Sequence, residues 1–548
     1  MRLLAVFCVF FCLHACAQKS PPDFDYILRQ GTVYDGSGRT GYIADVAITA
    51  DTIAAVGDLK DKTAMNEIDV TGLAVAPGFI NMLSWADRSL LMDGRSMSDI
   101  KQGVTLEVFG EGWSPAPVRR KPSQAGVDSL WTTLDGYFSY LMKKGISPNV
   151  ASFVGATSVR IHELGYEDRS PTAEELGRMQ DLVRDAMKDG AMGVGSSLIY
   201  PPADYAKTDE LIALARVAAE YGGMYATHMR SEGDFIIAAL RETLQIAHEA
   251  NISTEIYHLK INLSRNWGRI HDVLAIVDSA RRAGLRITAN NYPYVASATG
   301  LTARMPNWVQ EGGAAQMRKR LRDPATRRKV LYEMRNGIPY KNSDAKDVML
   351  IGFRLDSLNE RYRGKRLDEV ARMRGQDEDE TVLDLVTLDR SPIAAVYYQQ
   401  SEDNIRRIIQ MPYVSFGSDG ASLSDDPVFA NWGTHPRAYG TFARILGNYV
   451  RDEQLLPLED AIRKMTLLPA LNLGIADRGR VSSGYFADLA IFDPLRIKDL
   501  ATFEDPKQYA IGMVHVFING KPVLLNGEHT GAKPGRVIRG PGYSPPTP

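Results

Sequence analysis

The sequence predicts an α/β protein: a (β/α)8 TIM-type barrel with a small β-sandwich domain formed by both chain ends. Between residues 73 and 420, strand-like runs alternate with helical patterns, which is typical of parallel strands joined by helices. Shorter alternating segments with turn residues lie on both sides of this region and indicate antiparallel strands. The chain has 548 residues, of which 44% are hydrophobic, so it can form one large core and a smaller second one.

The first residues have the layout of an export signal, which we assign to 1–17. Arg2 precedes an apolar run at 3–13, and small residues follow this run. Cleavage after Ala17 and lipidation of Cys16 in the lipobox-like LHAC are two alternatives that the pattern leaves open. We therefore expect a periplasmic or extracellular protein, which contacts a membrane only if Cys16 carries a lipid anchor.

All three cysteines of the chain lie within this predicted export signal. The mature chain would then have no thiol for a disulfide or for a thiolate ligand. Any metal ion would have to be bound by His, Asp, Glu or a modified Lys.

Two segments, 22–75 and 475–535, predict the small β domain. Both contain short alternating runs, and DG and GSG serve as turn signals in the first of them. Asn519-Gly520 in the second is a strong signal for a two-residue hairpin. We expect the two segments to pair into one domain beside the barrel.

The predicted barrel occupies residues 76–474, and eight candidate strands form it. They are LAVAPGFINML, VTLEVFG, NVASFVG, AMGVGSSL, GMYATHM, STEIYHLK, LRITANNYPY and YVSFGSDG. Helical patterns separate most of them, such as the one in which Thr172 and Glu175 make a capping box and Gly190 ends the helix. A longer charged stretch at about 300–411 precedes the eighth strand, and we interpret it as an insertion or lid.

Four polar residues end predicted barrel strands: Glu111, His228, His258 and Asp419. Barrels of this kind have their active sites at the C-terminal ends of the strands. Two imidazoles and one carboxylate suit Zn²⁺ and leave a position open for water. We therefore predict that Glu111, His228 and His258 bind a metal ion. Asp419 is then the general base, which takes a proton from the attacking water and passes it to the leaving group.

Each of these residues also has a structural interpretation. A single histidine at a strand end is often a satisfied structural residue, although two on adjacent strands are harder to explain in this way. Asp419 in GSDGAS could cap a helix or form an Asx-turn. Glu111 in GEG could be a solvated loop carboxylate.

A set of short segments extends over nearly the whole chain after residue 17. They are VAPGFINMLSWA, QGVTLEVFGEGWSPAPV, GMYATHMR, YHLK, FGSDGAS, HPRAYGTFARIL, MTLLPA, YFADLAIFDP and TGAKPGRVIRG. By this set the chain resembles the N-acyl-D-amino-acid deacylases, or D-aminoacylases, of the amidohydrolase superfamily. The resemblance implies a barrel with a β domain made from both ends, and metal-dependent hydrolysis of the acyl amide of an N-acyl-D-amino acid.

The resemblance also implies roles for single residues. His228 and His258 match the ligands on the fifth and sixth strands, and Asp419 matches the catalytic aspartate of the eighth. Arg437 in HPR matches the arginine that binds the substrate carboxylate, a task that suits a guanidinium group.

Lys260 and Tyr292 match further substrate contacts in the family. A carbamylated Lys260 that bridges two metal ions is an alternative to this role. For the arginine of HPR, the alternative is an ion pair with Asp425 or Asp426.

Two features depart from the family pattern. Leu83 and Trp85 stand where the end of the first strand would carry two histidines, and Glu111 stands where well-known members have a cysteine ligand. Leu83 and Trp85 cannot coordinate a metal ion, so we expect their apolar bulk to close that side of the site. The prediction is therefore a single ion, taken to be Zn²⁺.

The predicted function is that of an exported, metal-dependent amidohydrolase, which converts an N-acyl-D-amino acid into a D-amino acid and a carboxylate. A related dipeptidase or cyclic-amide or lactone hydrolase, and a non-catalytic binding homologue, are the alternatives. A formal net charge of −2 gives no electrostatic reason to expect nucleic acid as a partner. The sequence does not indicate an oligomeric state.

Overall fold

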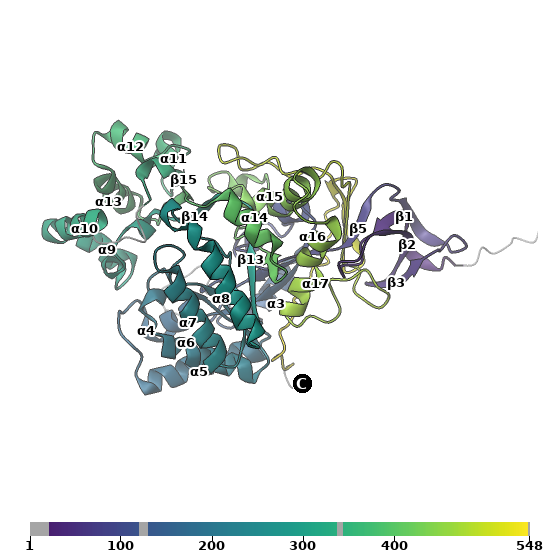
Figure 1. The fold of residues 1–548 in the computed structure, drawn as a ribbon, viewed down its shortest axis with the longest axis horizontal. Coiled ribbons are helices and arrows are strands. Elements are labelled where there is room, and N and C mark those ends of the chain that lie inside the picture. The colour runs from purple at the N-terminus through teal and green to yellow at the C-terminus, as the bar shows by residue number, and fades with distance from the viewer. Residues whose placement is uncertain (1–20, 120–129, 337–342, 546–548) are drawn as a thin grey trace, which may run out of the picture.

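The structure, a computed structural model, describes residues 21–119, 130–336 and 343–545 (Figure 1). The predicted export signal at 1–17, with Cys16, lies outside these residues. Within the described ranges, none of the helices combines the length and the apolar character that crossing a membrane requires. The barrel lies in the middle of the molecule, between the small β domain at one end and a helical subdomain at the other.

Eight parallel strands form the barrel, and each of the eight candidate sequences contributes one of them. In order they are β6 (Phe79–Asn81), β7 (Val104–Phe109), β8 (Asn149–Ser152) continued by β9 (Val154–Gly155), β10 (Gly193–Ser197), β11 (Met224–His228), β12 (Ser253–Ile256), β13 (Ile287–Asn291) and β17 (Val414–Phe416). The barrel closes between β17 and β6, where the amide of Met82 donates to the carbonyl oxygen of Phe416 at 3.2 Å. The predicted fold class is confirmed.

Helices follow the strands and cover the barrel from outside. They are α1 (Ser89–Met92), α2 (Met97–Ile100), α3 (Leu134–Lys144), α4 (Ala156–Leu164), α5 (Ala173–Lys188), α6 (Thr208–Glu220), α7 (Ile236–Glu249), α8 (Ile270–Arg282), α14 (Glu402–Gln410), α15 (Arg437–Arg444), α16 (Leu458–Met465) and α17 (Leu467–Asn472). Helix α5 has the predicted capping box of Thr172 and Glu175 and buries Met179, Val183 and Met187. Such apolar stripes hold the helices against the strands.

The small β-sandwich domain combines strands from both chain ends. It contains β1 (Phe24–Val33), β2 (Tyr42–Thr49), β3 (Thr52–Gly57), β4 (Ala64–Asp69), β5 (Ala74–Pro77), β18 (Leu489–Phe492), β19 (Met513–Ile518), β20 (Lys521–Leu525) and β21 (Glu528–His529). Strand β5 joins the two groups, because it pairs with β1 on one side and with β18 on the other. Asn519 and Gly520 both have positive φ and form the hairpin between β19 and β20.

An insertion between β13 and β17 forms the helical subdomain, which we call the cap. Its antiparallel sheet consists of β14 (Ala296–Gly300), β15 (Val348–Gly352) and β16 (Ala394–Tyr398), and its helices are α9 (Ala314–Arg322), α10 (Pro324–Asn336), α11 (Asp356–Tyr362), α12 (Leu367–Arg374) and α13 (Glu378–Asp389). The cap has a hydrophobic core of its own. Helix α14 instead buries Ile405, Ile408 and Ile409 against the barrel, so the barrel resumes before residue 411.

Candidate active site

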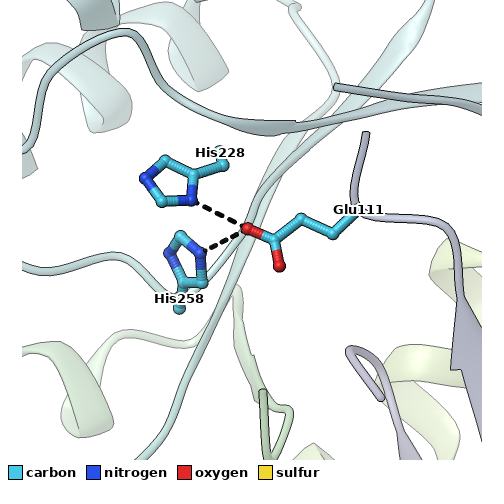
Figure 2. A group of neighbouring side chains, drawn as sticks. All are labelled: Glu111, His228 and His258. Atoms are coloured by element: carbon cyan, nitrogen blue, oxygen red, sulfur yellow. Dashed lines mark hydrogen bonds and ion pairs between the residues drawn. The ribbon is translucent and has the colours of Figure 1, made fainter. Parts of the chain in front are cut away.

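Three of the predicted site residues meet at the C-terminal ends of the barrel strands. Oε1 of Glu111, which follows β7, lies 2.8 Å from Nδ1 of His228 and 2.9 Å from Nε2 of His258 (Figure 2). One ligand atom from each residue lies within 4.8 Å of the other two, and all three residues are buried. The structure thus brings the three predicted metal ligands together.

The two glycines beside Glu111 explain how this carboxylate reaches the barrel interior. Gly110 and Gly112 have φ values of +108° and +72°, which favour glycine. A Cβ on Gly110 would lie 2.5 Å from the carbonyl oxygen of Phe153, and one on Gly112 would lie 2.5 Å from Cβ of Ser197. The GEG segment therefore fits closely between strands, and Glu111 is a buried residue rather than a solvated loop carboxylate.

Glu232 is a fourth member of the cluster that the sequence analysis missed. Its Oε1 lies 3.0 Å from Nδ1 of His258, and its Oε2 lies 3.6 Å from Nε2 of His228. These are the imidazole nitrogens that point away from Glu111. A carboxylate in this position orients metal-binding imidazoles and raises their basicity. The only sequence signal is an acidic residue four positions after a strand-end histidine.

The electrostatics of the cluster favour a cation. Burial raises the pKa of Glu111, but His258 and His228 lower it well below its usual range, so this group is a carboxylate. Burial likewise raises the pKa of Glu232, but Lys260 and the two histidines have the larger effect and lower this pKa well below its usual range. Burial and Lys260 lower the pKa of His258, whereas Glu232 and Glu111 raise it, with a net result of about 9.

These residues fit a bound metal ion. Their donor atoms are two imidazole nitrogens and a carboxylate oxygen, the set that Zn²⁺ prefers in catalytic sites. Nε2 of His228 is buried without a hydrogen-bond partner among the described residues, and the nearby carboxylate of Glu232 gives the cluster further negative charge. We conclude that Glu111, His228 and His258 are able to hold the ion, while Glu232 contacts the outer nitrogens of the two imidazoles.

Replacing Glu232 by glutamine should weaken metal binding without removing a ligand. The neutral amide cannot match the charge of the carboxylate against the two imidazoles, so we expect the affinity for zinc to fall roughly 10- to 100-fold. A competition titration with a chromophoric chelator measures this affinity. Asp234→Asn is the matched control, because Asp234 pairs with Arg265 outside the cluster. Equal zinc affinity in Glu232→Gln and wild type would show that Glu232 does not support the ligands.

Asp419 follows β17 at the same end of the barrel and has a φ of +48°, a strained value for a residue other than glycine. Its Oδ2 lies 2.8 Å from Nη1 of Arg437, and its Oδ1 accepts a hydrogen bond of 3.0 Å from Nε1 of Trp85. Burial raises the pKa of Asp419; Arg437 opposes this shift and Glu111 adds to it, leaving the pKa raised. A raised pKa brings a carboxylate closer to the range of an efficient general base.

Leu83 and Trp85 behave differently from each other. Leu83 is fully buried in the barrel core, where its carbonyl oxygen accepts a hydrogen bond of 2.8 Å from the amide of Asp419. Trp85 donates its indole N–H to Oε2 of Glu111 and to Oδ1 of Asp419, both at 3.0 Å. Trp85 therefore has a polar contact in addition to the apolar bulk expected of it, because its indole N–H points at the two carboxylates.

The residues predicted to contact substrate lie next to Asp419. The guanidinium of Arg437 lies 4.6 Å from the centre of the Tyr292 ring, and its Nε has no hydrogen-bond partner among the described residues. Its ion pair is with Asp419, not with Asp425 or Asp426. Lys260, a predicted substrate contact, also contacts the metal-binding cluster. Its Nζ lies 2.5 Å from Oε1 of Glu232 and 2.7 Å from Nδ1 of His258.

A cavity of about 1090 Å³ opens above this cluster, between the barrel and the cap. Aromatic side chains from both parts line it, together with the site residues; these are Trp85, Trp113, Tyr200, Tyr292, Phe353, Tyr397 and Trp432. The cavity exceeds the space that a metal ion and a few waters need. It therefore provides room for an organic substrate beside the cluster.

A family model for the amidohydrolase family matches residues 66–524. The chain belongs to the amidohydrolase family. The match covers the barrel, the cap and part of the β domain, so it includes all residues of the cluster described above. This amidohydrolase is accordingly a metal-dependent hydrolase of amide bonds.

Characterised relatives place this amidohydrolase in the D-aminoacylase branch. D-aminoacylase of Alcaligenes xylosoxydans xylosoxydans is 36% identical over 95% of this chain and 99% of its own length. N-acyl-D-glutamate deacylase of the same organism is 32% identical over 94% and 96%. Both relatives are matched over almost their full length, so the resemblance inferred from the motifs is confirmed.

Solved structures agree with this assignment. A crystal structure of D-aminoacylase has a TM-score of 0.79 at 35% identity and covers 94% of this chain and 100% of that one. N-acyl-D-glutamate deacylase of Bordetella bronchiseptica, solved with zinc and a phosphonate that mimics the tetrahedral intermediate, has a TM-score of 0.79 at 30% identity, covering 94% and 99%. For D-aminoacylase, a binuclear metal centre with one-metal activation and second-metal attenuation is described.

Proposed function

We propose that this amidohydrolase hydrolyses the acyl amide of N-acyl-D-amino acids and releases a D-amino acid and a carboxylate. The observation that carries the proposal is the position of Asp419, which contacts Arg437 on one side and shares the Trp85 N–H with the ligand Glu111 on the other. A proton-transferring carboxylate thus stands between a metal-binding cluster and a cation suited to a substrate carboxylate. Relatives of this chain named as a D-aminoacylase, an N-acyl-D-glutamate deacylase and an N-acyl-D-aspartate deacylase support the proposal.

The residues of the chain divide the reaction between them. The metal ion held by Glu111, His228 and His258 would act as a Lewis acid on the amide. Asp419 takes a proton from the attacking water and delivers it to the nitrogen of the leaving amine. The raised pKa of Asp419 supports both transfers, because the group must accept and then release a proton within one turnover.

Arg437 binds the carboxylate of the substrate in this proposal. Its buried Nε lacks a partner among the described residues, and the ring of Tyr292 supports the guanidinium from one face. Lys260, paired with Glu232, adds a second cation at the floor of the site. Placed beside the scissile amide, these charges would select an N-acyl amino acid over a simple amide.

A panel of substrates tests the function. N-acetyl-D-amino acids, their L-enantiomers, dipeptides, and cyclic amides and lactones are assayed with the zinc-loaded protein. We expect kcat/KM to be greatest for the N-acetyl-D-amino acids. Greater activity on cyclic amides, lactones or dipeptides would assign the site to a related hydrolase, and zinc-loaded protein without activity on any of them would be a binding homologue.

Replacing Arg437 by lysine should weaken substrate use. A single ammonium group cannot make two parallel hydrogen bonds to a carboxylate, so we expect a loss of about 2 kcal/mol of transition-state binding, a fall of roughly 30-fold in kcat/KM. Steady-state kinetics on an N-acetyl-D-amino acid measure this effect. Arg444→Lys on the same helix is the control, because Arg444 contacts Pro293 and Asp499 outside the cluster. An unchanged kcat/KM in Arg437→Lys would remove Arg437 from substrate binding.

We also propose that one zinc ion suffices and that the enzyme acts outside the cytoplasm. The first proposal is supported by the single cluster of three His, Asp, Glu or Cys ligands that the described residues form. The second rests on the signal-like residues 1–17 alone. Cell fractionation of wild type and of Cys16→Ala tests it: a membrane-bound wild type and a released variant indicate a lipid anchor, whereas cytoplasmic protein in both contradicts export.

A further inference from the structure

Trp85 has no task in the reaction described so far, although within the described part of the chain its indole N–H is the only group that donates a hydrogen bond to both Glu111 and Asp419. We propose that Trp85 is a positioning residue that stands in for a second metal ion: its N–H holds Glu111 and Asp419 in place, and its ring keeps a second ion out. The inference rests on the proposed one-ion deacylase and adds how such an enzyme dispenses with a binuclear centre.

Glu111 and Asp419 each contact the indole through one carboxylate oxygen and their other partners through the second oxygen. Glu111 turns Oε1 to the two histidines and Oε2 to the indole. Asp419 turns Oδ2 to Arg437 and Oδ1 to the indole. Each carboxylate therefore uses one oxygen for its proposed task and the other for Trp85. Such two-point contacts fix the plane of a carboxylate, which a single contact leaves free to rotate.

The shared donor also offsets a repulsion. Two carboxylates in a buried site repel each other strongly, because little solvent screens them. In a binuclear centre, a cation close to both groups would reduce this repulsion. The indole N–H is a neutral donor with partial positive charge, so it can serve both carboxylates without adding a net charge.

The backbone places the indole with little freedom. The amide of Trp85 donates to the carbonyl oxygen of Gly420 at 2.9 Å, and Ser84 and Gly420 form a parallel bridge between the ends of the first and eighth strands. Oγ of Ser84 donates to the buried carboxylate of Glu107 at 2.7 Å. Trp85 and Asp419 therefore follow the ends of two strands that are hydrogen-bonded to each other, which keeps the indole next to the general base.

Excess zinc should not attenuate the activity of this enzyme. D-aminoacylase is described with second-metal attenuation, and a binuclear centre requires a second ligand set. By the motif resemblance, Leu83 and Trp85 of the present chain stand where the first strand of the family ends in two histidines. We therefore expect the activity of this enzyme to stay constant when free zinc rises beyond the amount that loads the first ion.

A pair of variants at position 85 separates the hydrogen bond from the bulk. Trp85→Phe keeps a flat apolar ring but lacks the N–H, and we expect kcat to fall about tenfold or more with little change in KM. Trp85→Gln restores an N–H donor with little affinity for zinc and should recover part of the lost kcat. Both variants should retain one equivalent of zinc, measured by elemental analysis.

Trp131→Phe is the matched control, because its indole donates to the carbonyl oxygen of Pro115 away from the cavity. It should lose stability without losing kcat. Full kcat in Trp85→Phe would overturn the positioning role, because the aromatic bulk alone would then suffice. A Gln variant that recovers none of the kcat lost in the Phe variant would also overturn it, because restoring an N–H donor would then have no effect.

A double variant tests the exclusion of a second ion. Leu83→His/Trp85→His offers two first-strand imidazoles, and we expect it to bind a second equivalent of zinc and to lose activity as that equivalent binds. Wild type should bind one equivalent and show no attenuation over the same range of free zinc. Two equivalents of zinc in wild type, or only one equivalent in a folded double variant, would contradict the claim that Trp85 keeps a second ion out. If the double variant does not fold, the wild-type titration decides alone.

Zinc content is measured without substrate. It therefore separates a failure of this inference from a failure of the proposed function, which would appear only in the substrate panel.

Discussion

Replacing Asp419 by asparagine should reduce kcat by about 10²-fold or more while the protein keeps its zinc. An amide cannot accept the proton of the attacking water, yet it preserves the shape of the side chain and a hydrogen-bonding oxygen for Trp85. The ion should stay because Asp419 contacts Arg437 and Trp85 but is not one of the three clustered ligands. Steady-state kinetics and elemental analysis on the same protein sample measure both quantities.

Asp425→Asn is the control for this experiment, because Asp425 is an exposed carboxylate six residues further along the chain. It should retain wild-type kcat and zinc content. If Asp419→Asn loses zinc together with activity, Asp419 is a metal ligand and not the proton carrier. If it retains most of its kcat, another group transfers the proton.

Replacing Glu111 by alanine should strongly weaken the binding of zinc. The change removes one of three ligands and leaves two buried imidazoles whose basicity then depends on Glu232 alone. We expect the affinity for zinc to fall by at least roughly 100-fold, with activity lost in parallel at limiting zinc. A competition titration with a chelator gives the affinity, and circular dichroism reports whether the variant is folded.

Glu220→Ala provides the comparison, because Glu220 is exposed at the end of α6. Its zinc affinity should equal that of wild type. A folded Glu111→Ala protein that binds zinc as tightly as wild type would show that the carboxylate replacing the family's cysteine is not a ligand.

Much of the fold follows from local sequence patterns. Each barrel strand is a short run of apolar or small residues between helical patterns, and the hairpin at Asn519-Gly520 needs only two residues to specify it. The limit of the cap was less predictable. Helix α14 resembles the charged helices before it along the sequence, and only the burial of Ile405, Ile408 and Ile409 against the barrel assigns it to the barrel.

The candidate site was predictable where a rule about strand ends applies. His228 ends a strand, and the other three predicted residues, Glu111, His258 and Asp419, follow strand ends within three residues; the barrel brings such positions together. Glu232 lies beyond its strand in a loop, and nothing local shows that the loop returns to the histidines. The role of Trp85 was hidden for another reason: its residue type suggests bulk, whereas the contact depends on where a single N–H group points.

The pairing of Lys260 was equally invisible in the sequence. A lysine two residues after a strand-end histidine is compatible with contacts to substrate, to solvent or to a carboxylate. Its partner Glu232 comes from the loop after another strand, at a separation of 28 residues. Interactions of this kind depend on the path of the loops, which periodicity and turn signals do not determine.

The central claim is that one ion, held by Glu111, His228 and His258, makes this amidohydrolase active on N-acyl-D-amino acids. Reconstitution of the metal-free protein with zinc tests it most directly, with kcat/KM for an N-acetyl-D-amino acid recorded at each ratio of zinc to protein. The account predicts a linear rise that ends at one equivalent and a constant value above it. Activity that continues to rise towards two equivalents, or full activity before any zinc is added, would contradict the account.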